Sequence, residues 1–288
     1  HQPTLGKKNP MAYKLYMLSS EITPFAEQYG LASFVNKLST EIKEREHDIR
    51  LIMPKYGFIS SRKYVLREVI RLRDIEARWA SEIVTGNVRS AFVPETKVQV
   101  YFLELANYFD DVDQSLYTGD DGSLEDNIHR FGLFSKIALR TLEKLFWQPD
   151  IVIANDWSSA FSVLLQKKLF IREEFFSKGK SIFMLHSLDE HLDFSADALF
   201  SAEVDPDEMP VEVTDSTRLI DLAAAVADEV VLVNSSETNM EEAVDNDKQM
   251  QDILNSRDSA PKIIDANAES DEEWQEVASQ VEEVIQEV

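Results

Sequence analysis

The chain has 288 residues, of which 44% are hydrophobic and 28% are charged, and its formal net charge is −24. It contains no cysteine, which excludes disulfides and thiolate metal sites and favours a reducing, cytoplasmic location. The negative charge disfavours binding to nucleic acid or to an anionic membrane, and no apolar run reaches the roughly 18 residues of a membrane-spanning helix.

Residues 1–10 are polar, and we interpret them as a flexible leader or an expression remnant, with Met11 as a natural start. Short β-branched and aromatic runs then recur along the chain, each apolar on both faces. The predicted strands are Tyr13–Leu18, Asp48–Met53, Val98–Leu103, Asp150–Ala154, Ser181–Leu185 and Glu229–Val233. Helix-period segments follow the first and the third strand. This alternation predicts an α/β domain with a doubly wound, mostly parallel sheet over residues 11–258.

Two segments outside this pattern, Val65–Leu72 and Arg89–Val93, are expected to form a hairpin at one edge of the sheet. The acidic segment Leu188–Asp215 is interpreted as a mobile loop or a lid. Ligands of open parallel sheets bind outside the carboxyl ends of the strands, near the switch point of the strand order. The stretches expected at that edge are Ser19–Leu31, Asn155–Ser158, His186–His191 and Asn234–Glu237.

The last part of the chain is acidic, with 15 acidic and 3 basic residues between positions 241 and 288. Residues 259–288 are predicted to form a linker and an amphipathic helix. Ser270 and Glu273 have the spacing of a capping box, and Trp274, Val277, Val281 and Val284 follow on one face. We expect this face to cover apolar surface of the sheet domain or of a second copy; the alternative is a solvated helix.

Three stretches carry further motifs. Leu18–Leu31 reads LSSEITPFAEQYGL, Val100–Asp110 reads VYFLELANYFD, and Trp147–Ala160 reads WQPDIVIANDWSSA. In order and spacing they resemble "SE-x-x-PFAKTGGL", "VYFLD-x-x-YFDR" and "WRPDVVHAHDWHTA" in the N-terminal domain of bacterial glycogen synthases and plant starch synthases. The resemblance extends from about Ala12 to Asp258.

The resemblance implies a Rossmann-like domain equivalent to one half of a GT-B glycosyltransferase, a family that transfers glucose from ADP- or UDP-glucose to an α-1,4-glucan. In complete enzymes of the family a second Rossmann-like domain holds most of the sugar-nucleotide site. Only 30 residues follow Asp258, so we expect that domain to be absent here and to be supplied, if at all, by a separately encoded chain.

The chain departs from the family pattern at several polar positions. Glu27 stands at the lysine of the family's KTGGL motif, Tyr29 replaces its first glycine, and Gly30 is retained. A carboxylate at position 27 would repel the diphosphate that the lysine attracts. Asn155 and Ser158 replace the two histidines that flank the Asp-Trp pair of the third motif.

The resemblance points to substrate-binding residues but to no catalytic one. The candidates are Glu21, Gly30, Asp156, Trp157 and His186. The alternative for Glu21, Asp156 and Trp157 is loop capping and packing at strand ends, and for His186 a structural hydrogen bond. Asp126, Asn127 and Arg130 are interpreted as a helix start with a supporting ion pair, and His191 as a surface residue.

No cofactor and no metal is expected, because dinucleotide, Walker and HExxH motifs are missing and the five histidines do not cluster at metal-ligand spacing. We therefore expect a glycogen or starch synthase-like glycosyltransferase domain that is inactive as an isolated chain. The alternative is a non-catalytic module that binds a glucan, a nucleotide sugar or a protein. Homo-oligomerisation is a third interpretation of the amphipathic tail.

Overall fold

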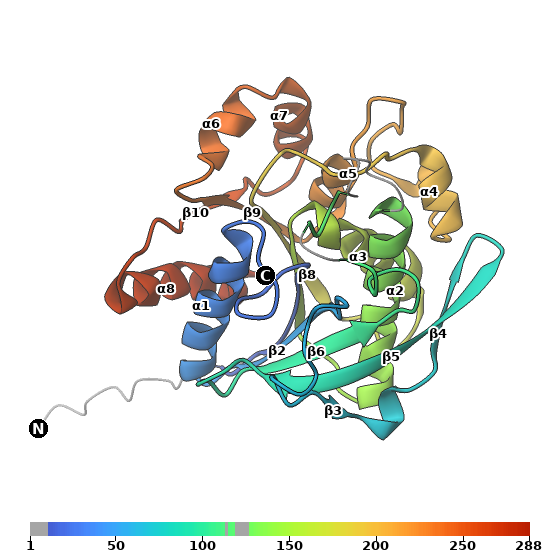
Figure 1. Ribbon diagram of the computed structural model, residues 1–288. Coiled ribbons are helices and arrows are strands. Elements are labelled where there is room, and N and C mark those ends of the chain that lie inside the picture. Colours follow the sequence, from blue (N-terminus) through green and yellow to red (C-terminus); the bar gives the residue numbers. More distant parts are fainter. Residues whose placement is uncertain (1–10, 113–114, 119–126) are drawn as a thin grey trace, which may run out of the picture.

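The computed structural model describes residues 11–112, 115–118 and 127–288 (Figure 1). In this part of the chain ten strands form one sheet, with the order β10-β9-β8-β7-β1-β2-β6-β5-β3 and with β4 paired to β5. The strands are β1 (Lys14–Leu18), β2 (Asp48–Pro54), β3 (Arg67–Glu68), β4 (Ile75–Trp79), β5 (Glu82–Phe92), β6 (Gln99–Glu104), β7 (Ile151–Asn155), β8 (Lys180–Leu185), β9 (Glu229–Asn234) and β10 (Lys262–Asp265). The helices are α1 (Leu31–Glu44), α2 (Asn127–Leu145), α3 (Ala160–Leu164), α4 (Ala196–Ser201), α5 (Leu219–Val226), α6 (Met240–Asp245), α7 (Lys248–Asn255) and α8 (Asp271–Glu287).

The sheet is doubly wound, as the sequence predicts. The strands from β10 to β6 are parallel, and β5 joins β6 in the antiparallel direction. From β1 the chain first builds β2 and β6 on one side, and it later adds β7, β8 and β9 on the other side. The switch point of the sheet therefore lies between β1 and β7, where Leu15 pairs with Ile151.

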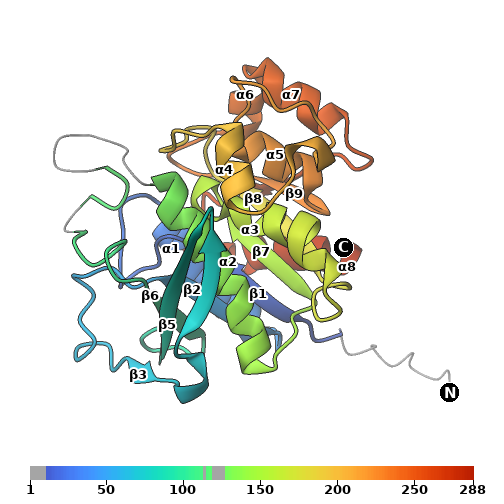
Figure 2. The same ribbon diagram turned by 90° about the vertical axis from the view of Figure 1, so that its right-hand side faces the viewer.

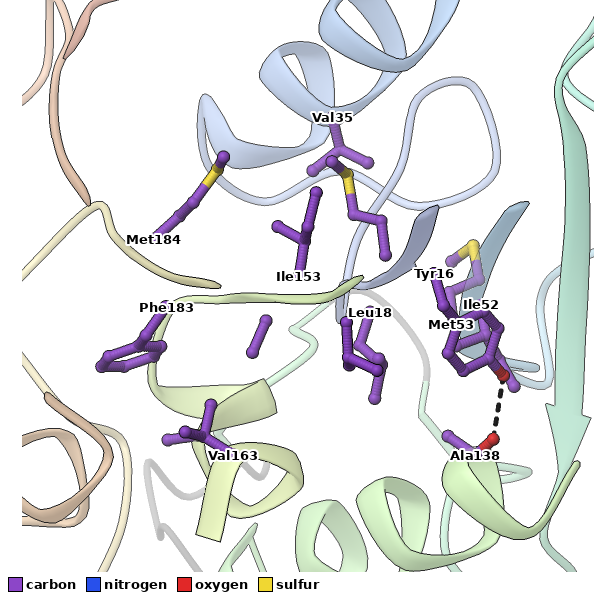
Figure 3. Packing of buried hydrophobic residues seen from close by; sticks show 14 of the residues in the cluster. Tyr16, Leu18, Val35, Ile52, Met53, Ala138, Ile153, Val163, Phe183 and Met184 are labelled. Atoms are coloured by element: carbon purple, nitrogen blue, oxygen red, sulfur yellow. Dashed lines mark hydrogen bonds between the residues drawn. The ribbon is translucent and has the colours of Figure 1, made fainter. Parts of the chain in front are cut away.

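Helices cover both faces of the sheet (Figures 1 and 2). In Figure 3, Val35 of α1 packs on one side of the sheet, and Ala138 of α2 and Val163 of α3 pack on the other. Between them lie strand residues such as Ile153, and the buried Tyr16 hydroxyl donates a hydrogen bond to the Ala138 carbonyl over 2.9 Å. The strands are buried on both faces, which explains why their sequences are almost continuously apolar.

Three segments differ from their predictions. The segments expected as a hairpin do pair, at Arg67 and Ser90, but the adjacent hairpin partner of β5 is β4, which was not predicted. The segment interpreted as a mobile loop or lid contains α4, in which Leu199 is buried. The polar linker contributes β10, an edge strand paired with β9. Within the described ranges, each helix is too short or too polar to cross a membrane.

Helix α8 packs against α1 (Figure 1). The Ser270 hydroxyl accepts from the Glu273 backbone N–H over 3.2 Å, and the Glu273 carboxylate accepts from the Ser270 N–H over 2.9 Å, which completes the expected capping box. Trp274 is buried and meets Phe34 of α1 edge-on, with 6.1 Å between ring centroids. Arg45 donates to the Glu282 carboxylate over 2.8 Å. The tail therefore packs on its own sheet domain.

Candidate functional site

A cavity of about 620 Å³ opens at the carboxyl ends of β1, β7, β8 and β9. These four strands are neighbours in the sheet, so the loops that follow them lie side by side at its switch point. The loops supply most of the wall, and Tyr117, Ala266, Ala268 and Trp274 complete it. The four stretches that the sequence placed at this edge all contribute to the cavity wall.

The candidate residues converge on this one cavity. Its wall includes Glu21, Gly30, Asp156, Trp157 and His186. They come from three loops and from the start of α1, and the parallel order of the strands brings them together. Each is held in place by a different set of contacts.

Glu21 organises the loop between β1 and α1. Its buried carboxylate accepts hydrogen bonds from the backbone N–H groups of Gln28 (2.5 Å) and Tyr29 (2.9 Å), and from the Tyr117 hydroxyl (2.8 Å). Burial raises the pKa of Glu21, although these donors act in the opposite direction. These contacts are those of a loop cap, which was the alternative interpretation for this residue.

Gly30 begins helix α1 and meets a carboxylate from the far side of the cavity. Its backbone N–H lies 3.1 Å from both carboxylate oxygens of Glu237, which follows β9. A Cβ atom at position 30 would lie 3.2 Å from the same carboxylate, so a side chain here would push Glu237 away. Glu27, expected to repel a phosphate, is exposed and does not line the cavity. The carboxylate that accepts from the Gly30 N–H is therefore that of Glu237 and not that of Glu27.

Asp156 is held in a strained backbone conformation, with φ 58° and ψ −175°. This region is almost restricted to glycine and costs of order 1–3 kcal/mol for other residues. One carboxylate oxygen of Asp156 accepts from the backbone N–H groups of His186 (3.3 Å) and Ser187 (3.2 Å), which joins the ends of β7 and β8. Burial raises the pKa of Asp156 from 3.8 to about 7. Near neutral pH this carboxyl group can therefore both donate and accept a proton.

His186 is neutral, because burial lowers its pKa to about 3. Its Nε2 atom lies 3.1 Å from the Asn155 amide oxygen, which only accepts, so Nε2 carries the proton and Nδ1 is left as an acceptor. The ring packs edge-on against Phe34, with 4.7 Å between centroids. His186 thus makes the structural hydrogen bond proposed as its alternative role, and the residue also lines the cavity.

The two residues that replace the family's flanking histidines have structural contacts. The Asn155 amide donates to the Leu18 carbonyl over 3.0 Å, which fixes the amide orientation. The Ser158 hydroxyl donates to the Ser20 hydroxyl over 2.8 Å, and Ser20 in turn lies 2.7 Å from the Tyr117 hydroxyl. Both substitutions therefore tie the ends of β1 and β7 together.

Aromatic rings form a platform on one side of the cavity. Tyr29 and Tyr117 are stacked at 5.9 Å with 8° between their planes, and His191 stacks on Tyr117 at 5.6 Å and 21°. Trp157 meets Tyr117 edge-on at 5.0 Å. His191, interpreted as a surface residue, is partly exposed and takes part in this platform, where burial lowers its pKa.

Asn127 supports the platform from behind. Its side-chain amide donates to the Tyr117 carbonyl (2.6 Å) and to the His191 carbonyl (2.5 Å), and Arg130 donates to the Asn127 amide oxygen over 2.9 Å. These contacts join the start of α2 to two cavity loops. Asp126, the proposed third member of this group, lies outside the described residues.

The cavity wall is acidic. Among the described residues that line it, the carboxyl groups are those of Glu21, Asp156, Asp189 and Glu237, and none of those residues is lysine or arginine. No group of three or more potential metal ligands occurs in the described part of the chain. The described part of the wall therefore combines hydrogen-bond acceptors with aromatic side chains, and it includes no lysine or arginine to bind an anionic ligand.

The sequence did not single out several residues of the wall, including Tyr29, Glu237 and Trp274. Tyr29 and Glu237 lie within stretches expected at this edge, but neither was singled out as a site residue. Trp274 comes from α8, more than a hundred positions beyond Asp156 and Trp157. Trp274 lacks a local signal for this position, because an apolar helix face has the same sequence pattern whatever surface it covers.

Known proteins resemble this chain over most of its length. Residues 14–256 match the family model described as the starch synthase catalytic domain. The glycogen synthase of Pelodictyon phaeoclathratiforme is 34% identical over 178 residues, which is 61% of this chain and 36% of that protein. That of Chlorobaculum parvum is 33% identical over 199 residues, or 68% of this chain and 40% of that protein. The chain thus spans little more than a third of the length of these curated relatives.

A solved structure shares the fold. The catalytic domain of starch synthase IV from Arabidopsis thaliana, bound to ADP and acarbose, superposes with a TM-score of 0.75 and 20% identity. The match covers 91% of this chain and 53% of that one. It supports the GT-B half expected from the sequence.

Proposed function

The chain belongs to the family of the starch synthase catalytic domain, and from this premise we propose that its cavity binds an α-1,4-glucan as a neutral saccharide and that these 288 residues do not transfer glucose by themselves. The observation that carries the proposal is the composition of the cavity wall, where carboxyl groups and aromatic rings occur together and where no described residue is lysine or arginine.

A neutral sugar suits such a wall. The C–H faces of a glucose ring pack on aromatic rings, and Tyr29, which lines the cavity and is 42% exposed, offers such a ring. Its hydroxyl groups can donate to Asp156 and to Nδ1 of His186, and the protonated form of Asp156 can donate in return. Each contact uses a group that is already held in place by the fold.

A nucleotide sugar suits the wall poorly. Two like charges about 5 Å apart repel by roughly 3 kcal/mol at an effective dielectric constant near 20. A diphosphate at the start of α1 would meet the carboxylates of Glu237 and Glu21, and the described cavity wall supplies no cation in compensation. Donor binding, and with it glucosyl transfer, is therefore not expected of this chain.

A second candidate function is supported by the residues that keep the family pattern. Glu21, Asp156, Trp157 and His186 all line one cavity, as expected for the half-site of a working transferase. In this alternative the chain is one half of a glucosyltransferase, and a second Rossmann-like domain supplies the cations that bind ADP- or UDP-glucose.

Two measurements separate the candidates. Calorimetric titration with maltoheptaose, ADP-glucose and UDP-glucose should show heat for maltoheptaose alone. Tyr29→Ala, at a cavity side chain 42% exposed, should abolish this heat, whereas Phe146→Ala, at a side chain 86% exposed and outside the cavity, should not. Incorporation of labelled glucose into glycogen should stay at background. Incorporation that His186→Ala removes would instead establish the second candidate, and absence of maltoheptaose binding would refute the first.

A further inference from the structure

Glu237 reaches across the mouth of the cavity. It follows β9, whereas its partner Gly30 follows β1 in the chain, and β8 and β7 lie between those two strands in the sheet. Both carboxylate oxygens lie 3.1 Å from the Gly30 N–H, across 207 positions of sequence. The contact therefore connects opposite walls of the cavity.

The turn that carries Glu237 is well defined. The Ser235 N–H donates to the Thr238 carbonyl over 2.9 Å, and the Ser235 hydroxyl accepts from the N–H groups of Glu237 and Thr238, each over 3.2 Å. Downstream, the Asn234 side chain accepts from the Met240 N–H over 2.8 Å. The carboxylate is thus presented by a hydrogen-bonded turn, although its side chain is exposed to solvent.

Glu237 completes a set of carboxylate contacts at the start of α1. Glu21 already accepts from the N–H groups of Gln28 and Tyr29, and Glu237 accepts from the next one, that of Gly30. Backbone N–H groups at the start of a helix are donors that suit an anion, and the helix dipole adds to the attraction. Here the chain occupies these donors with its own anions.

We propose that Glu237 is an autoinhibitory contact, an internal anion that occupies the start of α1 and bars phosphate-bearing ligands from the cavity. The idea rests on the proposed function, because it gives the reason why the cavity selects a neutral saccharide. It assigns the exclusion chiefly to Glu237, because Glu237 is exposed, whereas Glu21 is buried and its charge is already stabilised by the Gln28 and Tyr29 N–H groups and the Tyr117 hydroxyl. Removing the Glu237 side chain is therefore expected to admit an anion without rebuilding the wall.

The test uses the full chain and inorganic pyrophosphate as the probe, with heat measured by calorimetry at low salt. The wild type should show no binding. Glu237→Ala should bind pyrophosphate at least tenfold more tightly than the wild-type detection limit, and the affinity should fall as salt is added. Glu237→Gln keeps the length of the side chain but loses its charge, so its affinity for pyrophosphate should lie between those of the wild type and Glu237→Ala. Glu242→Ala, an equally exposed change on α6, should behave like the wild type.

Titration of maltoheptaose into the same samples distinguishes the autoinhibitory contact from the saccharide proposal. If maltoheptaose binds the wild type but neither Glu237 variant gains pyrophosphate binding, the autoinhibitory contact is wrong and the saccharide proposal stands. If Glu237→Ala gains pyrophosphate binding while no protein binds maltoheptaose, the contact stands and the saccharide proposal fails. Pyrophosphate binding by the wild type with the variant's affinity would also overturn the contact. Unchanged melting temperatures would show that the variants are folded.

Discussion

Replacing Asp156 by asparagine measures how much the burial of this carboxyl group lowers the free energy of unfolding. The side chain is 7% exposed, and burial raises its pKa from 3.8 to about 7. Asparagine keeps an oxygen that can accept from the N–H groups of His186 and Ser187, but it has no proton to lose. The substitution should therefore remove the pH dependence of this site while leaving its hydrogen bonds in place.

The direction of the pH effect on stability follows because the pKa of Asp156 is higher in the folded chain than in the unfolded chain. At about pH 3 the Asp156 carboxyl group is protonated in both the folded and the unfolded chain, so it does not change the free energy of unfolding there. Between about pH 4 and pH 7 the unfolded chain ionises while the folded chain keeps its proton, so the free energy of unfolding falls as the pH rises. Above pH 7 both states are ionised and the fall ends. A shift of about three units corresponds to a total of about 4 kcal/mol.

Urea unfolding at about pH 5 and pH 8 measures the effect. Of the total loss, about 2 to 3 kcal/mol falls between these two pH values, and Asp156→Asn should lose that much less stability than the wild type over the interval. Part of the decline should remain, because burial also raises the pKa of Glu190 to about 7 and that of Glu21.

Asp189→Asn is the matched control, since Asp189 lines the same cavity but is exposed. The free energy of unfolding of this variant should change with pH as it does in the wild type. If the Asp156→Asn and wild-type curves run parallel from about pH 5 to pH 8, Asp156 is not protonated in the folded state and the reasoning from burial is wrong.

Two further substitutions test the tail and the loop before α1. Trp274→Ala should lower the free energy of unfolding by about 3–5 kcal/mol because it empties a buried site between α8 and α1, whereas the exposed Glu276→Ala should change it by less than about 0.5 kcal/mol in the same urea assay. Glu27→Lys should leave the calorimetric response to ADP-glucose unchanged, because this side chain lies outside the cavity wall; a clear gain in affinity would contradict that placement.

The central strands are readable from the sequence because their signal is local. The six predicted strands, from the first at Tyr13–Leu18 to the last at Glu229–Val233, agree with β1, β2, β6, β7, β8 and β9 to within one residue at each end. Burial on both faces demands an apolar residue at nearly every position, and a short apolar run of this kind is typical of a central parallel strand. β4 and β10 lie outside this rule, because one belongs to a hairpin at the sheet edge and the other has only four residues.

The position of the candidate site was also predictable, since the carboxyl ends of parallel strands share one edge. The residues expected there, such as Asp156 and His186, do meet in the cavity. The chemistry of the cavity was not predictable to the same degree. The loss of the family's lysine pointed to Glu27 as the repelling carboxylate, but the side chain at the start of α1 comes from Glu237.

The sequence by itself thus determined the elements, their alternation and the edge at which their loops gather, because these depend on short-range periodicity and on the direction of parallel strands. The tertiary structure alone decided which groups meet: the Glu237 carboxylate and the Gly30 backbone N–H across 207 positions, and Trp274 in the cavity wall. An exposed carboxylate and an apolar helix face have no local pattern that specifies their partners. These contacts form only when the folded sheet brings together segments that are far apart in the chain.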